Sequence, residues 1–197
     1  MYLKDDTGKG FGSIGNLNSW LAGKHKKLLF AMNGGMYMEN GSPLGLYIES
    51  GEMKHGLNKS SGSGNFYMKP NGVFYMLKDN TARITSTQDF RLAQNIQYAT
   101  QSGPLLLMNG QIHSLFKEGS ANLNIRNGVG ILQDGKVIFA MSKTSVSFYD
   151  FAAYFKKLGC KDALYLDGFV SRTYYPEKNW VQTDGNFGVI IGVTQKQ

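Results

Sequence analysis

The acidic residue with the most suggestive position in the sequence is Asp167. It directly follows the apolar run Ala163–Leu166 and precedes Gly168, so we expect it at the end of a buried strand. Binding and catalytic side chains often stand at such strand ends. An Asp-Gly pair is also a common turn, which leaves a purely structural role for Asp167 open.

A second candidate segment begins at Asn33, directly after the apolar run Leu28–Met32, and continues through Gly34 and Gly35 to Tyr37. Consecutive glycines let backbone N–H groups approach a ligand closely, and the Asn33 side chain offers both a donor and an acceptor. Taken by itself, the segment is slightly better explained as a simple glycine turn.

Two further segments combine a strand boundary with glycine. Arg126 precedes Asn127-Gly128-Val129-Gly130, and it is one of only four arginines in the chain. A guanidinium binds phosphate through two parallel hydrogen bonds, so Arg126 is a candidate phosphate ligand. Ser102-Gly103-Pro104 ends one expected strand and opens another. Each signal is weak by itself.

Familiar catalytic motifs are missing from the sequence: there is no G-x-S-x-G elbow, no Walker loop and no H-E-x-x-H. His25, His55 and His113 lack metal-ligand spacing, and we expect them at the surface or in turns. The single cysteine, Cys160, excludes a disulfide within the chain and is expected to be a core thiol. We expect no cofactor, although a bound divalent cation stays open.

Short strands are expected to position these residues. The 197 residues include 25 glycines and 4 prolines, which favours many tight turns, with hairpins at 69–72, 108–110 and 133–136. The expected strands are Leu28–Met32, Leu44–Glu49, Phe66–Lys69, Val73–Leu77, Ala82–Thr85, Ile96–Thr100, Leu105–Met108, Val129–Leu132, Val137–Met141, Ala163–Leu166 and Phe187–Val193.

Helices are expected to be few. Phe148–Leu158 has an apolar face, Ser147 as its N-cap and Gly159 as its stop, and Asn16–Ala22 is a shorter candidate. The glycine- and serine-rich stretch from Gly51 to Gly64 is expected to be a mobile loop. The sequence predicts the α+β class: a single domain over residues 1–197 with mixed, largely antiparallel sheets, whose N-terminal strands are expected to be cut short.

The charge of the chain favours attraction of anionic ligands but does not define a function. The net charge is +7, but most of the cations are lysines scattered along the sequence, which is typical of a solvated surface. We therefore expect no specific nucleic-acid partner. No apolar run approaches the length of a membrane span, and the oligomeric state stays open.

Taken in order, these segments resemble the phosphodiester glycosidase family, from about Leu28 to Val193. The order and spacing are more specific than any one motif. The resemblance is carried by Asn33–Tyr37, Gly45-Leu46, Ser102–Leu105, Arg126–Gly130, Phe139–Ser142 and Ser147–Gly168.

The resemblance implies hydrolysis of a glycosyl phosphodiester, releasing a sugar and a phosphomonoester. A phosphomonoester has a second pKa of about 6, so it leaves far more easily than a sugar hydroxyl. Asp167 and Arg126 are then the expected catalytic residues: Arg126 binds the phosphate, and Asp167 stabilises the sugar cation, activates water or holds sugar hydroxyls. The expected substrate-binding residues are Asn33, Gly34, Gly35, Tyr37, Ser102, Gly103, Gly168 and Ser171.

Two other functions stay open. A non-catalytic glycan or phosphoglycan binding module on the same scaffold would keep the pocket but would not hydrolyse its ligand. General polyanion binding would depend steeply on salt. Bacterial members of the family are often described as exopolysaccharide-related. The usual substrates of the family imply an extracytoplasmic location, periplasmic or secreted, although the first residues carry no signal peptide.

Overall fold

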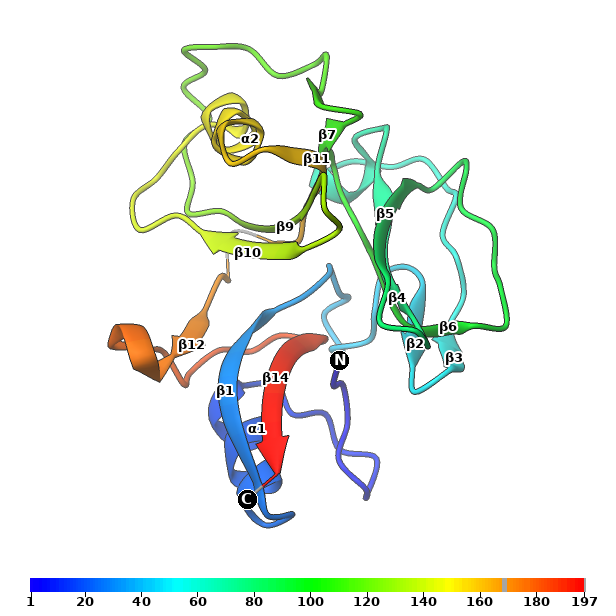
Figure 1. The fold of residues 1–197 in the computed structure, drawn as a ribbon, viewed down its shortest axis with the longest axis vertical. Coiled ribbons are helices and arrows are strands. Elements are labelled where there is room, and N and C mark those ends of the chain that lie inside the picture. The colour runs from blue at the N-terminus through cyan, green and yellow to red at the C-terminus, as the bar shows by residue number, and fades with distance from the viewer. Residues whose placement is uncertain (168–169, 197) are drawn as a thin grey trace.

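The computed structural model describes residues 1–167 and 170–196. This part of the chain contains two α-helices and fourteen strands, and all the pairings between these strands are antiparallel. The strands form three sheets around a common centre (Figure 1). The predicted α+β class with few helices and largely antiparallel sheets is confirmed.

The first sheet brings the two ends of the chain together. Its strands lie in the order β13-β12-β1-β14, and helix α1 (Ile14–Ala22) packs on β1. Ser13 caps this helix by accepting a hydrogen bond from the backbone N–H of Asn16. The bounds are β1 Lys26–Asn33, β12 Thr173–Tyr175, β13 Trp180–Val181 and β14 Ile190–Lys196.

The second sheet carries helix α2 (Phe148–Lys157), and its strand order is β10-β9-β11-β7-β8. Phe151 and Phe155 of the helix pack against Ala163 and Tyr165 of β11, as the sequence predicts. The bounds are β7 Leu105–Met108, β8 Gln111–Ile112, β9 Asn127–Leu132, β10 Val137–Met141 and β11 Cys160–Tyr165.

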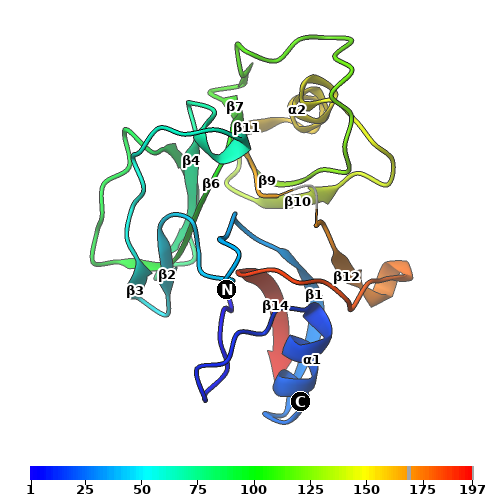
Figure 2. The same cartoon turned by 180° about the vertical axis from the view of Figure 1, so that it is seen from behind.

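The third sheet has the order β3-β2-β6-β4-β5. Figure 2 shows it to one side of the other two sheets. The bounds are β2 Tyr47–Glu49, β3 Glu52–His55, β4 Gly72–Leu77, β5 Ala82–Ser86 and β6 Ile96–Ser102.

A shared core joins the three sheets. Met32 of β1, Phe74 of β4 and Leu164 of β11 belong to one buried cluster, together with Leu166 and Ile191. The three sheets therefore bury their apolar faces against one another, and the last residues of β1, β6 and β11 converge at this core. Those strand ends carry the candidate site.

Two expected elements are wrong. The expected strand Phe66–Lys69 is a 3₁₀ turn over Asn65–Tyr67, held by a hydrogen bond of 2.8 Å from the Asn71 amide to the Phe66 carbonyl. The stretch 69–72 therefore does not join two strands. The expected loop Gly51–Gly64 begins with a strand, since β3 pairs with β2.

Candidate functional site

Two asparagine side chains from two sheets, together with the backbone of Asp167, form the centre of the candidate site. The amide nitrogen of Asn127 lies 3.0 Å from both the backbone and the side-chain oxygen of Asn33. The Asn127 side-chain oxygen accepts the backbone N–H of Asp167 at 2.7 Å. The Asn33 amide in turn donates to the Asp167 carbonyl at 3.2 Å. The ends of β1, β9 and β11 are thus tied together beside the Asp167 carboxylate.

The chain that follows Asp167 closes the cluster. The Ser171 hydroxyl donates to the Asp167 carbonyl at 2.6 Å, and the backbone N–H of Arg172 donates to the Asn33 side-chain oxygen at 3.0 Å. Asn33, Asn127 and Ser171 are all buried, whereas Asp167 is partly exposed. Buried hydrogen-bonded amides fix the backbone of Asp167, which is the acidic residue of the cluster.

Tyr37 stands beside Asp167. Its hydroxyl donates to the Asn186 carbonyl at 2.6 Å. Burial raises the pKa of Tyr37, and the negative charge of Asp167 raises it further. The phenol therefore stays protonated at neutral pH and lies within electrostatic range of the carboxylate.

The predicted glycines and Ser102 have packing roles in this structure. A Cβ at Gly34 would lie 2.6 Å from Ile191 Cγ1, and one at Gly35 would clash with Thr100 Oγ1. A Cβ at Gly103 would lie 2.6 Å from the Asn71 Cβ. Ser102 is fully buried, and its hydroxyl donates to the Leu166 carbonyl at 2.5 Å, which joins β6 to the chain just before Asp167. The predicted ligand Gly168 lies outside the described residues.

Arg126 points to the opposite side, toward α2. Its Nε donates to the Val146 carbonyl and one Nη to the Asn122 carbonyl, both at 2.9 Å. The guanidinium carbon lies 3.5 Å from the centre of the Phe148 ring, and Tyr165 is also a neighbour. Burial lowers the pKa of Arg126, while Tyr165 acts in the opposite direction.

The placement of Arg126 differs from the phosphate-binding role expected from the sequence. Successive residues of an extended chain point to opposite faces, so Asn127 faces Asn33 and Arg126 faces the helix. With 1% of its surface exposed, Arg126 holds the 122–126 segment against Val146 and Phe148.

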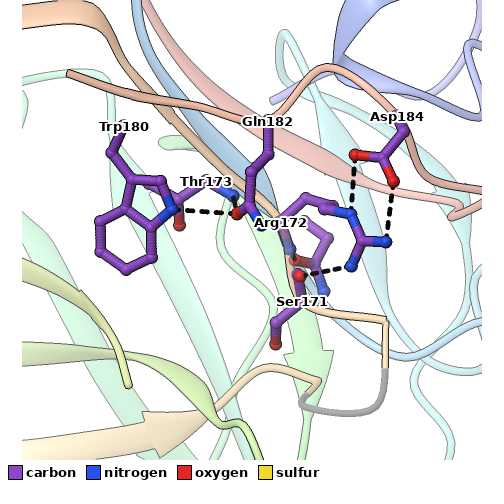
Figure 3. A network of polar contacts seen from close by, with 7 residues as sticks. Ser171, Arg172, Thr173, Trp180, Gln182 and Asp184 are labelled. Carbon is purple, nitrogen blue, oxygen red and sulfur yellow. Dashed lines mark hydrogen bonds and ion pairs between the residues drawn. The ribbon is translucent and has the colours of Figure 1, made fainter. Parts of the chain in front are cut away.

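A different arginine stands next to the cluster (Figure 3). Arg172 pairs with Asp184 through two contacts of 2.8 Å, from Nε and from one Nη. Its remaining Nη donates to the Ser171 carbonyl at 3.0 Å. Sequence reasoning missed Arg172 and Asn127, although Arg172 is one of only four arginines and lies five residues after Asp167.

The described residues contain neither a candidate metal-binding cluster nor a candidate membrane-spanning helix. Across residues 1–167 and 170–196, no three His, Cys, Asp or Glu side chains are grouped so as to hold a metal ion. Within the same residues, neither helix is long and apolar enough to cross a membrane. Cys160 is buried, and burial raises the pKa of its thiol, as expected of a core cysteine. His113 is buried rather than at the surface, and it begins a turn in which its carbonyl accepts the Phe116 N–H at 3.0 Å.

The chain belongs to the phosphodiester glycosidase family, whose family model matches residues 26–194. The uncharacterized protein YigE of Escherichia coli (strain K12) is 42% identical over 175 residues, which cover 88% of this chain and 68% of that protein. The family resemblance seen in the sequence is thereby confirmed.

Solved structures share the fold. The zebrafish N-acetylglucosamine-1-phosphodiester alpha-N-acetylglucosaminidase catalytic domain, auto-inhibited by its pro-peptide, superposes with a TM-score of 0.61 at 19% identity. The match covers 86% of this chain and 64% of the zebrafish chain. A hypothetical protein from Synechocystis matches with a TM-score of 0.51 at 12% identity, covering 98% of this chain and 54% of that one.

Proposed function

We propose that this protein hydrolyses a glycosyl phosphodiester, releasing a sugar and a phosphomonoester, with Asp167 as the carboxylate that acts on the sugar. The observation that carries the proposal is the Asn33–Asn127–Asp167 cluster in a chain of the phosphodiester glycosidase family. In this cluster the buried amides bind the backbone of Asp167, so its partly exposed carboxylate is held at the strand end.

The proposed reaction does not require a strong general acid. The oxygen of water bonds to the anomeric carbon of the sugar, the bond from that carbon to the phosphate oxygen breaks, and the electron pair leaves with the phosphate. The proton of water passes to Asp167 or to solvent. Because a phosphomonoester has a second pKa of about 6, it leaves without full protonation. Asp167 then supplies negative charge where positive charge develops on the sugar ring.

The test uses the simplest substrates of this class, the methyl phosphodiesters of N-acetylglucosamine 1-phosphate, glucose 1-phosphate and mannose 1-phosphate. We expect the protein to convert at least one of them to free sugar and methyl phosphate. The appearance of methyl phosphate is detected by ³¹P NMR. The reaction is run in ¹⁸O-labelled water, because the label reports which bond breaks. Cleavage at the sugar carbon leaves methyl phosphate unlabelled.

Two outcomes contradict the proposal. Labelled methyl phosphate would mean attack at phosphorus and a phosphodiesterase rather than a glycosidase. Binding of the esters without conversion would mean a glycan-binding module on the same scaffold. Asp162→Asn is the control for Asp167→Asn, because it also removes a carboxylate near this strand. Asp162 lies on β11, and its side chain accepts the backbone N–H of Asn109.

A further inference from the structure

A basic hollow lies beside the candidate site. It has a volume of about 400 Å³, and its wall includes Ser142, Lys143, Ser171, Arg172, Lys178 and Trp180. Ser171 is the residue whose hydroxyl donates to the Asp167 carbonyl. The wall of the hollow therefore includes a residue bonded to the backbone of Asp167, the residue proposed to act on the sugar.

The charges around this hollow favour an anion. Lys143 and Lys178 are exposed, and among residues 1–167 and 170–196 neither forms an ion pair. Arg172 is the third cation, and its pairing with Asp184 leaves it at the wall of the hollow. No carboxylate belongs to the described wall, so its charged residues are two lysines without an ion pair and the Asp184-paired Arg172. A phosphate group matches this charge and the hydroxyl and amide donors around it.

A second, more apolar hollow adjoins the first. Its volume is about 520 Å³, and its wall includes Phe139, Met141, Val146, Phe151, Tyr154 and Trp180. The two hollows share Met141, Ser142, Lys143 and Trp180. A ligand with a charged end and an apolar end can therefore occupy both without leaving the surface.

Trp180 is fixed between the two hollows. Its indole N–H donates to the Gln182 side-chain oxygen at 3.1 Å, and that same oxygen accepts the backbone N–H of Thr173 at 3.0 Å (Figure 3). The Lys143 ammonium lies 5.3 Å from the centre of the indole ring. A hydrogen-bonded indole is a rigid apolar surface that costs little conformational entropy when a ligand packs on it.

We propose that the two hollows bind the leaving half of the substrate: the phosphate in the basic hollow and an apolar alkyl or aryl group, esterified to it, in the apolar hollow. The proposal rests on the proposed function, because the orientation of the substrate assumes that its sugar lies at Asp167. It names the class of substrate as a sugar 1-phosphodiester with an apolar second ester group.

The test measures binding of the leaving half itself, by calorimetry of methyl phosphate, hexyl phosphate and glucose 6-phosphate. We expect hexyl phosphate to bind at least tenfold more tightly than methyl phosphate, since each fully buried methylene contributes about fourfold. Glucose 6-phosphate, whose ring is polar, is expected to gain much less.

Two variants separate the hollows. Tyr154 belongs to the apolar wall and has 51% of its surface exposed, so Tyr154→Ala is expected to remove most of the hexyl advantage and leave methyl phosphate binding unchanged. Lys178 belongs to the basic wall, so Lys178→Ala is expected to weaken all three ligands by a similar factor. Lys157→Ala, at an exposed position of the same helix as Tyr154, is the matched control.

Equal affinity for hexyl and methyl phosphate would overturn the proposal, as would tighter binding of glucose 6-phosphate than of hexyl phosphate. A hexyl advantage that survives Tyr154→Ala would also overturn it. Tight binding of hexyl phosphate with no hydrolysis of any glycosyl phosphodiester supports the subsite and contradicts only the proposed reaction. The two proposals are thus judged by different measurements.

Discussion

Asn127 bonds to Asn33 twice, through the backbone oxygen and the side-chain oxygen of Asn33, at 3.0 Å in each case. The two residues end or begin strands of different sheets, β1 and β9. Because both are buried, these contacts replace water for polar groups that would otherwise be unsatisfied. The pair therefore joins two sheets and positions Asp167 at the same time.

The first prediction concerns Asn127→Ala. The substitution removes the Asn127 contacts to the Asn33 backbone oxygen and the Asp167 N–H, while the Asn33 side-chain oxygen keeps the Arg172 N–H, so we expect a loss of about 1–3 kcal/mol in the free energy of unfolding. We also expect the turnover of the folded protein to fall by tenfold or more, because Asp167 loses a positioning contact. Urea unfolding and rates measured on the same samples check both effects.

Asn124→Ala is the control for this prediction, since Asn124 is exposed and its amide contacts only the nearby Asn122 side chain among the described contacts. We expect its stability to stay within about 0.5 kcal/mol of the unchanged protein. A similar loss in both variants would show that the cluster has no special role.

The second prediction compares two arginines. Arg126→Lys replaces a buried planar group, stacked on Phe148 and bonded to two carbonyls, by an ammonium that cannot reproduce this geometry. We expect a loss of about 2–4 kcal/mol in the free energy of unfolding, with kcat/KM of the folded fraction close to normal.

Arg172→Lys is expected to behave in the opposite way. The Arg172–Asp184 pair is largely exposed, and such pairs contribute about 0–1 kcal/mol, so stability should change little. Substrate binding should weaken, since lysine cannot contact Asp184 and the Ser171 carbonyl at the same time, and these contacts hold the cation at the wall of the hollow. Stable Arg126→Lys protein with a strongly reduced kcat/KM would return the phosphate role to Arg126.

Helix α2 and the hairpins at 108–110 and 133–136 were predictable because their signals are local. Ser147 accepts from the backbone N–H of Asp150, as an N-cap does, and the apolar residues of Phe148–Lys157 recur at helical spacing. The turn at 133–136 joins β9 to β10, as predicted. In contrast, β12 and β13 are three and two residues long, and they exist because β1 offers an edge to β12. No pattern within such short segments indicates a strand.

The candidate site was predictable at the level of strand ends but not of side-chain direction. The sequence pointed to the segments of Asn33, Arg126 and Asp167, and the structure brings Asn33 and Asp167 together. Which of two neighbours, Arg126 or Asn127, faces them depends on the register between β9 and β11, and that register is a tertiary property. Phe66 was misassigned for a similar reason, since the Asn71 amide bonds to its carbonyl.

The third prediction concerns the pH dependence of stability. His113 is buried and stacked on Phe116, and burial lowers the pKa of its imidazole. The folded protein therefore holds His113 neutral at a pH where the unfolded chain, with a pKa of about 6.5, takes up a proton. Stability is retained above that pH and falls as the pH drops below it, by at most about 1.4 kcal/mol per pH unit.

We expect this fall between pH 7 and pH 5.5 to be smaller in His113→Asn. The buried amino group of Met1, whose pKa burial lowers to about 6, titrates in the same window, so only the difference between variants is informative. His25→Asn is the matched control, because His25 is exposed and has a positive φ of 54° that asparagine tolerates. Parallel stability profiles for the unchanged protein and His113→Asn would contradict the prediction.

The last prediction concerns Asp167→Asn. The substitution is nearly isosteric. The cluster forms hydrogen bonds to the backbone N–H and carbonyl of Asp167, and the variant keeps both groups. We therefore expect the fold to survive with a change of less than about 1 kcal/mol in the free energy of unfolding. Loss of the negative charge beside the sugar should lower kcat by about 100- to 1,000-fold. The charge of Asp167 also raises the pKa of Tyr37, so that pKa should fall in the variant, which a spectroscopic titration of the phenols detects even without a substrate. A folded Asp167→Asn protein with near-normal kcat would mean that Asp167 only shapes the turn after β11, and the catalytic assignment would then be withdrawn.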